Sequence, residues 1–303
     1  MIPFKPFGPE DGKIFAPYLL QAAHKGCEYS FANLYMWGRQ SGAEVGGRLV
    51  FFSQFNRRTV YLFPAGSADV KPALDAVIED SRKRGIPCRL TCLSAEECRT
   101  VEQLYPGQFA FHISRDDFDY IYNVKELAEL SGRKFQKKRN HANRFWREHP
   151  DCKVVPLTEE NKYRAAEMIG QWFTQRLEQN PYGDFAMEQA AIRRGLGHLQ
   201  ELGLEGIYLE EEGKVLAVTL GSALNADTFD IHFEKAWDSV EGAYAAVNQA
   251  FAKYLTEKYP QLLYLDREDD MGQEGLRKAK LSYCPVQLTE KYWAHRKENN
   301  YDY

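Results

Sequence analysis

A short polar pattern at residues 230–234 contains the residue types that proton transfer needs. In an extended strand, alternate side chains share a face, so Asp230, His232 and Glu234 should point one way and Ile231 and Phe233 the other. A histidine beside carboxylates is a workable general base, because the negative charge fixes the ring tautomer and favours the protonated form. A solvent-facing polar side of a strand is the alternative, and the sequence leaves both open.

A second polar cluster, DREDD at residues 266–270, follows the strand-like sequence LLYL and precedes a helical pattern that begins near Gln273. Asp270 and Gln273 have the spacing of a capping box. However, four acids and an arginine are more than one helix cap needs, and loops beyond the carboxyl ends of strands commonly hold ligands. The cluster is therefore either a helix cap or part of a site.

The helix expected after this loop carries Arg277, Lys278 and Lys280. Cations near a helix C-terminus stabilise the helix through its dipole, so a structural role is the default. Together with the basic segment described next, they could line one site for an anion.

The segment Ser131–Arg147, SGRKFQKKRNHANRFWR, carries seven positive charges and no acid, although the formal net charge of the chain is -4. Its apolar residues fall on one stripe of a helix. A helix that began after Gly132 would place Arg133 and Lys134 in its first turn, where the dipole disfavours cations. The charges either pair with acids elsewhere or bind an anionic ligand such as phosphate, nucleic acid or an acidic headgroup.

The order of predicted elements suggests two similar α+β units. The first half is expected to run strand, helix, helix, strand, strand, helix, strand, helix, strand, with a turn at residues 56–58 and a closing β pair over Phe109–Tyr122. The second half repeats this order and ends with helices over Gly242–Tyr259 and Gln273–Tyr283 and a strand over Pro285–Tyr292. We expect an N-terminal unit at 1–125, a basic helical connector at 126–150 and a C-terminal unit at 151–303.

Several classes of protein are not indicated. The six cysteines form no pair of CxxC elements, so we expect no metal, and we interpret them as free thiols in a reducing cytoplasm. No apolar run approaches the roughly 18 residues of a membrane-spanning helix. Nucleophile elbow, Walker and dinucleotide-binding motifs are absent from the sequence.

Three motifs together resemble a known family. SGRKFQKKRNHANRF, then HFEKAW followed by EGAYAAVNQAFAKYL, and then LDREDDMGQEGLRKAKLSYCP resemble proteins related to the C-terminal domain of phosphatidylglycerol lysyltransferase. The resemblance covers roughly Asp119 to the C-terminus, and the N-terminal part only through element order. It implies two GNAT-like acyltransferase units in tandem, a fold in which acyl groups pass from a thioester or an aminoacyl-tRNA to an amine or hydroxyl.

The same resemblance assigns candidate site residues. We expect His232 or Glu234 to accept the proton, Arg267 or Arg277 to stabilise negative charge, and the basic helix to hold donor phosphate, such as the acceptor stem of a charged tRNA. The acceptor would be a small molecule or a lipid headgroup, with no further cofactor required. The catalytic candidates are His232, Glu234, Arg267, Glu268 and Asp269; the donor- or anion-binding candidates are Lys137, Lys138, Arg139, Asn140, Asn143, Gly272, Gly275, Arg277 and Lys278.

Two departures from the family pattern keep other functions open. Acetyl-CoA enzymes of this fold place a Q/R-x-x-G-x-G/A loop before the central helix to hold the pyrophosphate, whereas residues 237–243 here read WDSVEGA, with two acids and one glycine. The membrane lysyltransferases also carry spanning helices, whereas no stretch of this sequence predicts one. The alternatives are a non-catalytic tandem module that binds RNA or a phosphorylated ligand, and a coenzyme A-dependent N-acetyltransferase with an atypical loop.

Overall fold

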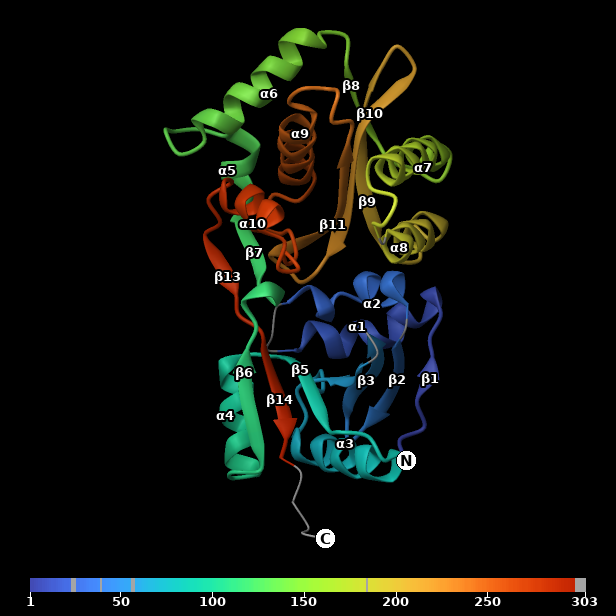
Figure 1. The fold of residues 1–303 in the computed structure, drawn as a ribbon, viewed down its shortest axis with the longest axis vertical. Helices are drawn as coiled ribbons and strands as arrows, with labels where there is room; N and C mark the ends of the chain where they lie inside the picture. The colour runs from blue at the N-terminus through green and yellow to red at the C-terminus, as the bar shows by residue number, and fades with distance from the viewer. Residues whose placement is uncertain (23–25, 39, 56–57, 184, 298–303) are drawn as a thin grey trace. The chain divides into compact units, whose positions relative to one another are not determined.

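The computed structural model describes residues 1–22, 26–38, 40–55, 58–183 and 185–297, so the turn expected at residues 56–58 lies largely outside it. The chain forms two compact units. Unit 1 comprises Met1–Asp119 and Thr289–Tyr303, and unit 2 comprises Tyr120–Leu288. Each unit contains one mixed sheet flanked by helices (Figure 1). None of the helices in the described part of the chain is long and apolar enough to cross a lipid bilayer.

Unit 1 is built on a sheet of order β1-β2-β3-β4-β5-β14-β6. Its aromatic and aliphatic residues form two buried clusters, one around Tyr61 and Leu90 and one around Phe51 and Tyr29. Its elements are β1 Lys5–Pro6, η1 Pro9–Asp11, α1 Gly12–Leu20, η2 Cys27–Tyr29, α2 Phe31–Trp37, β2 Gln40–Val45, β3 Arg48–Phe55, β4 Arg58–Leu62, α3 Lys71–Arg84, β5 Arg89–Leu93, α4 Ala95–Leu104, β6 Phe109–Ile113, η3 Arg115–Asp117 and β14 Tyr292–Arg296.

Unit 2 is built on a sheet of order β13-β7-β12-β11-β10-β9-β8. Helix α9 packs against one face of this sheet with α5 and α6 outside it, whereas α7 and α8 cover the other face (Figure 1). The elements are β7 Asp119–Asn123, α5 Val124–Glu129, α6 Gln136–Glu148, β8 Lys153–Pro156, α7 Lys162–Gln179, α8 Ala186–Gly197, β9 Leu204–Glu211, β10 Lys214–Ala223, β11 Thr228–Ala236, α9 Ala243–Lys258, β12 Tyr264–Asp266, α10 Glu274–Leu281 and β13 Gln287–Thr289.

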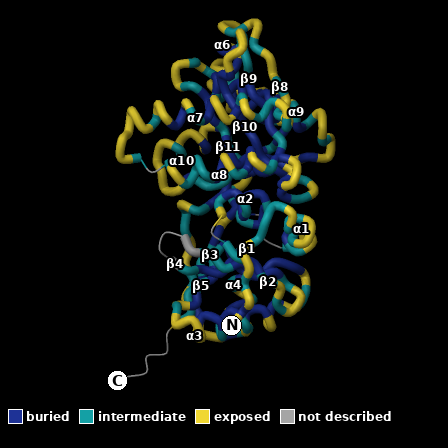
Figure 2. Tube along the Cα trace, turned by 90° about the vertical axis from the view of Figure 1, so that its right-hand side faces the viewer, coloured by how far each residue is buried: buried dark blue, intermediate teal, exposed yellow. Residues whose placement is uncertain are grey.

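Helix α9 is the centre of the unit 2 core, and its sequence explains why. Ten of its residues are buried, many of them alanines, so the helix can lie close to the sheet on one side and to α5 and α6 on the other. Figure 2 shows buried residues concentrated along the strands and exposed residues along the outer sides of the surface helices. The predicted helix over Gly242–Tyr259 is confirmed, with one residue fewer at each end.

The division of the chain differs from the predicted one in two ways. The expected connector at 126–150 is not separate, because the apolar stripe of α6, with Phe135 and Phe145, packs into the unit 2 core. The expected closing pair over Phe109–Tyr122 and the expected single strand over Pro285–Tyr292 are both wrong. The first segment contains β6 and β7, which belong to different sheets, and the second contains β13 and the start of β14, which also belong to different sheets. Strand β6 pairs with β14 in unit 1, and β7 and β13 are neighbours in unit 2.

Two local predictions about helix starts are also wrong. Helix α6 begins at Gln136, so Arg133 and Lys134 precede it rather than occupying its first turn, and the Lys134 ammonium lies 2.7 Å from the Glu126 carboxylate. Gln273 occupies the N-cap position of helix α10. The Asp270 carboxylate binds other groups instead of forming a capping box. For Asp270, hydrogen bonds from Arg277, Tyr120 and Gly272 replace the predicted contact with Gln273.

Candidate active site

Strand β11 contains a bulge that places His232. Leu220 of β10 pairs with Phe233, and the next residue, Gly221, pairs with Ile231, so His232 is the extra residue on β11. A bulge of this kind re-aims a side chain and interrupts the alternation of faces. The contacts before and after the bulge show both effects.

The bulge moves Glu234 to the face opposite the one predicted. Phe229 precedes the bulge and contacts Phe251 of α9. Glu234 lies five residues later, so strict alternation would put it on the opposite face, yet it also faces α9, where Asn248 donates to it at 3.2 Å. Lys235 lies over Trp172 of α7, on the other face. The prediction that Asp230, His232 and Glu234 share a face is therefore wrong for Glu234, because the extra residue reverses the alternation.

His232 is the centre of a buried hydrogen-bonded group. Its Nδ1 lies 3.1 Å from Glu268 Oε1 and 3.3 Å from Asp230 Oδ2, and its Nε2 lies 2.9 Å from the Ser222 hydroxyl. The side chains of His232 and Asp230 are fully buried, whereas that of Glu268 is 17% exposed. Glu268 is thus the member of this group that reaches solvent.

Arg267 belongs to a separate group on the α9 face. Its Nη2 lies 2.9 Å from Glu234 Oε1, and its guanidinium lies over the rings of Tyr122 and Tyr283. Burial opposes its charge, but the Glu234 carboxylate keeps the pKa of Arg267 raised above its usual value. Burial raises the pKa of Tyr283 to about 12, with Arg267 opposing the shift. This group is a partly buried ion pair, with side chains 13% and 10% exposed, that lies against two aromatic rings.

The two groups meet where β11 separates from β12. The parallel ladder between these strands covers three residue pairs and ends at Asp230 and Asp266, while β11 continues to Ala236. The chain after β12 turns away, and its consecutive residues Arg267 and Glu268 contact opposite faces of β11. We call this place the strand split.

The loop after β12 is held in an uncommon backbone conformation. Glu268 and Met271 have φ values of 55° and 50°, a region that residues with side chains seldom adopt. The buried Lys280 ammonium donates to the carbonyl oxygens of Arg267, Glu268 and Asp269, which ties the loop to α10. Backbone strain that is held in place by surrounding contacts is typical of functional loops, and the Glu268 carboxylate of this loop lies 3.1 Å from His232 Nδ1.

The remaining residues of the acidic loop have structural partners. The Asp270 carboxylate accepts two hydrogen bonds from Arg277, one at 2.5 Å from the Tyr120 hydroxyl and one from the Gly272 backbone N–H. Burial raises the pKa of Asp270, but these hydrogen bonds, with that from Arg277 the largest, lower it to about 2. Arg277 and Gly272 therefore stabilise the loop, and Asp269 contributes its carbonyl to the Lys280 contact.

The basic segment contributes one side chain to the α9-face group. Lys138 lies 4.0 Å from the centre of the Tyr283 ring, and burial together with Arg267 lowers its pKa. Arg139 is used internally, since it donates to the carbonyl oxygens of Leu130 and Gly132. Five other candidates are exposed and outside both groups: Lys137, Asn140, Asn143, Gly275 and Lys278.

Some residues at the strand split were not predicted. Ser222 and Asn248 each contact a predicted residue, and Lys280 and Tyr283 complete the surroundings. Asp230 and Lys280 lie in the polar patterns of the sequence, Lys280 as one of the cations that could line an anion site, but neither is among the predicted catalytic or donor-binding residues. The register of β10 against β11 decides the place of Ser222, and the bulge that shifts this register leaves no local signal in the sequence.

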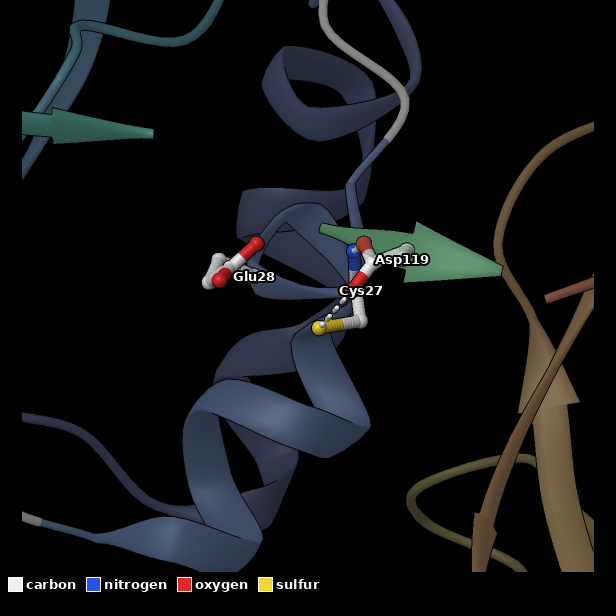
Figure 3. A group of neighbouring side chains, drawn as sticks. All are labelled: Cys27, Glu28 and Asp119. Atoms are coloured by element: carbon white, nitrogen blue, oxygen red, sulfur yellow. Dashed lines mark hydrogen bonds between the residues drawn. The ribbon is translucent and has the colours of Figure 1, made fainter. Parts of the chain in front are cut away.

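Among the residues that the structure describes, two groups of side chains bring potential metal ligands together. Asp230, His232 and Glu268 form one, and Cys27, Glu28 and Asp119 form the other. In the second group, in unit 1, the buried Lys291 ammonium lies 2.7 Å from both carboxylates and 3.5 Å from the Cys27 sulfur. Figure 3 shows Cys27 beside Asp119. The lysine supplies the positive charge that a metal would bring, so this group does not fit a metal ion.

Comparison with known proteins decides the family. A family model described as phosphatidylglycerol lysyltransferase, C-terminal, matches residues 21–295. The chain belongs to this family. The match includes both units, so the resemblance inferred from three motifs is confirmed and extends through the first half of the chain.

Solved structures confirm the fold. A protein of unknown function from Bacteroides thetaiotaomicron is 36% identical, over 98% of this chain and 100% of that one, with a TM-score of 0.92. L-PGS from Bacillus licheniformis is 16% identical, over 96% and 94%, with a TM-score of 0.68, and FemX is 11% identical, over 97% of each chain, with a TM-score of 0.63. The last two show the fold alone. The predicted α+β fold of two GNAT-like units is confirmed.

A curated relative is less informative. An uncharacterized protein of Mycoplasmoides gallisepticum is 24% identical over 181 residues, which are 59% of this chain and 56% of that protein. The chain therefore spans about half the length of this curated relative.

Proposed function

We propose that this protein is an acyltransferase that moves an aminoacyl group from an activated ester donor to an amine or hydroxyl acceptor, and that the reaction takes place at the strand split of unit 2. The observation that carries the proposal is the placement of Arg267 and Glu268. These consecutive residues contact opposite faces of β11 where it leaves β12, and each is fixed by a residue of β11. A carbonyl at the split would have a guanidinium on one side and a carboxylate on the other.

Glu268 is the proposed proton acceptor. His232 is a poor direct base, because its side chain is fully buried and both ring nitrogens already have partners. Glu268 is partly exposed and has His232 behind it. A general base must reach the proton that it removes, so exposure favours the carboxylate. His232 is then a positioning residue, and Glu234, the other residue expected to accept the proton, pairs with Arg267 instead.

Arg267 is the proposed stabiliser of the developing oxyanion. As the acceptor nitrogen or oxygen bonds to the donor carbonyl carbon, negative charge collects on the carbonyl oxygen, and a fixed buried donor stabilises it. Glu268 takes the acceptor proton, the ester bond to the donor breaks, and Glu268 returns that proton to the leaving oxygen. The guanidinium is held by Glu234 before substrate arrives, so it needs little reorganisation.

The N-terminus of α9 argues for an ester donor rather than coenzyme A. In the acetyl-CoA enzymes, the corresponding helix start holds the pyrophosphate. Here a Cβ atom at Gly242 would lie 2.3 Å from the His141 carbonyl oxygen of α6, so α6 covers this end of α9 closely. Glu241 beside it pairs with Arg144 of α6 and adds a negative charge. The exposed Lys137, Asn140 and Asn143 of α6 offer a surface for the phosphates of a charged tRNA.

The family description suggests the acceptor. Its words name transfer of a lysyl group to phosphatidylglycerol, so a hydroxyl on a phosphate-bearing headgroup is the first acceptor to try. Lys138, which lies beside Tyr283 and within the electrostatic influence of Arg267 and Glu234, is placed to contact such a phosphate.

The test is a transfer assay with donors compared side by side. The purified full chain is given total charged tRNA or acetyl-CoA, with phosphatidylglycerol vesicles and a panel of small amines as acceptors, and covalent product is measured. We expect product from charged tRNA that is lost in Glu268→Gln. Product from acetyl-CoA alone would contradict the donor assignment, and an undiminished rate in Glu268→Gln would contradict the base assignment.

A non-catalytic RNA-binding module is the second candidate, favoured by the exposed basic side chains of α6 alone. It predicts steeply salt-dependent binding that is equal for charged and deacylated tRNA, with no covalent product. Tighter binding of charged tRNA would contradict it.

A further inference from the structure

Three buried polar atoms around Glu234 lack hydrogen-bond partners within the part of the chain that the structure describes. They are Thr219 Oγ1, Asn248 Oδ1 and Arg267 Nη1. Thr219 is fully buried and Asn248 is 3% exposed. Buried polar atoms in native proteins are almost always satisfied, and leaving one unpaired costs free energy. Three such atoms in one place call for a ligand that the folded chain does not itself provide.

All three residues surround one carboxylate, that of Glu234. Asn248 donates to Glu234 Oε2 at 3.2 Å, and Arg267 donates to Oε1 at 2.9 Å. Thr219 pairs directly with Glu234 across the β10–β11 ladder, which places the two side chains on the same face. We call Thr219, Asn248 and Arg267 the shell of Glu234. Asn248 and Arg267 each use one polar atom to bind Glu234 and have a second polar atom without a partner among the described residues.

The chemistry of the three atoms limits the ligand. The Glu234 carboxylate accepts hydrogen bonds only, so the amide of Asn248 must turn its NH₂ toward Glu234, and its unpaired oxygen is an acceptor. Arg267 Nη1 can only donate, and the threonine hydroxyl can do either. A matching ligand must accept from Arg267 and donate to Asn248 over a short span. A plain acyl thioester has a carbonyl acceptor but no donor beside it.

We infer that this shell is a binding site for an α-amino acyl group, in which Asn248 Oδ1 accepts from the α-amine and Arg267 Nη1 donates to the adjacent carbonyl oxygen. The inference rests on the proposed function and adds its specificity: Asn248 and Thr219 select donors with a free α-amine. The α-amine ordinarily has a pKa near 7.7–8.0, so it can enter neutral despite the neighbouring Arg267 and Lys138 cations. A pocket built to bond an N–H group rejects an analogue that lacks it, because its own acceptor stays unpaired.

The test compares two donors that differ in one group. Total charged tRNA is paired with the same tRNA carrying the matching acyl group with hydrogen in place of the α-amine, and single-turnover loss of the acyl group is measured. We expect the wild-type chain to prefer the aminoacyl donor by about 10- to 100-fold, the range expected for one buried hydrogen bond. Asn248→Leu should remove most of this preference, and Thr219→Val, which keeps shape and removes only the hydroxyl, should reduce it.

A matched control lies next in sequence. Gln249→Leu makes the same kind of change on the same helix, but its amide donates to the Ala128 carbonyl outside the shell, so it should keep the donor preference while lowering stability. If the wild-type chain consumes both donors equally, or if Asn248→Leu and Thr219→Val keep the full preference, the shell holds only water and the inference is wrong. If no donor is consumed at all, the proposed function itself has failed.

Discussion

Two buried ionic groups, one in each unit, show how scaffold and site differ. In unit 1, the Lys291 ammonium is within 2.7 Å of both Asp119 and Glu28, and the Cys27 backbone N–H also binds Asp119, at 2.9 Å. In unit 2, Arg267 and Glu234 are 2.9 Å apart, yet three polar atoms around this ion pair have no hydrogen-bond partner among the described residues. The first group, which we call the closed group, is neutralised by its own lysine. In the second, which we call the open group, the arginine still has a donor without a partner among the described residues. Buried charge alone therefore does not mark a site; the proposed site differs from the closed group in the uncommon backbone conformation of its loop and in an arginine donor that has no partner among the described residues.

Removing the lysine should break the closed group, with the largest effect on stability. Burial opposes the charge of Lys291, but Asp119 holds its pKa well above the usual value, so the ammonium stays charged and paired. Lys291→Met leaves a buried carboxylate uncompensated, and we expect the free energy of unfolding to fall by about 3–5 kcal/mol, measured by urea denaturation. Unchanged stability would show that the group is not structural.

Replacing the Arg267 guanidinium of the open group should lower the transfer rate. Arg267→Lys keeps a positive charge beside Glu234 but removes Nη1, so we expect the transfer rate to fall about 100- to 1,000-fold. Arg164→Lys is the control and should keep the rate, because it alters an arginine of α7 that is paired with Glu210 of β9, outside the strand split. Equal rates for the two variants would remove Arg267 from the mechanism.

Asp270, which holds the loop that carries Glu268, should make the free energy of unfolding depend on pH. The pKa of Asp270 is lowered from 3.8 to about 2, so its contribution is fully present above pH 3.8 and is lost as the pH falls through about 2. We expect about 2 kcal/mol of acid-dependent stability from this group. Arg277→Gln should remove most of that slope in acid denaturation; an identical slope in wild type and variant would contradict the assignment.

The smallest expected change has the opposite sign. Thr219→Val removes a buried hydroxyl that makes no hydrogen bond among the described residues, so the ligand-free protein should become more stable by about 1 kcal/mol. Thermal unfolding measures this, with the exposed Thr174→Val as control, where the lost hydroxyl bonds only to its own helix. A destabilised Thr219→Val would mean that the hydroxyl already has a partner.

The positions of the long elements, and the polar stretches that meet at the strand split, could be predicted from the sequence. Helix α9 and the loop around Arg267 could be predicted, because helical periodicity and the DREDD cluster are local features. The bulge at His232 could not be, since one extra residue in a strand depends on pairing with β10. For the same reason Ser222, Thr219 and Asn248 escaped notice: each gains its role from a partner far along the chain.

The crossing of the chain between its two sheets was equally hidden. The sequence predicts a β pair over residues 109–122 and one strand over residues 285–292, but neither segment indicates which strand is its partner. The basic segment shows a related limit. Its charge was plain, but the structure uses Arg139 on backbone carbonyls and Arg144 on two glutamates, which leaves fewer cations for a ligand than composition suggests.

The central claim is that chemistry belongs to the strand split of unit 2 and not to the closed group of unit 1. One assay tests it: single-turnover transfer from charged tRNA by two variants that each exchange one carboxylate for an amide, Glu268→Gln and Glu28→Gln, normalised for folded protein by circular dichroism. We predict that Glu268→Gln loses at least about 100-fold, the usual contribution of a general base, while Glu28→Gln keeps the wild-type rate. A full rate in Glu268→Gln with loss in Glu28→Gln would contradict the account.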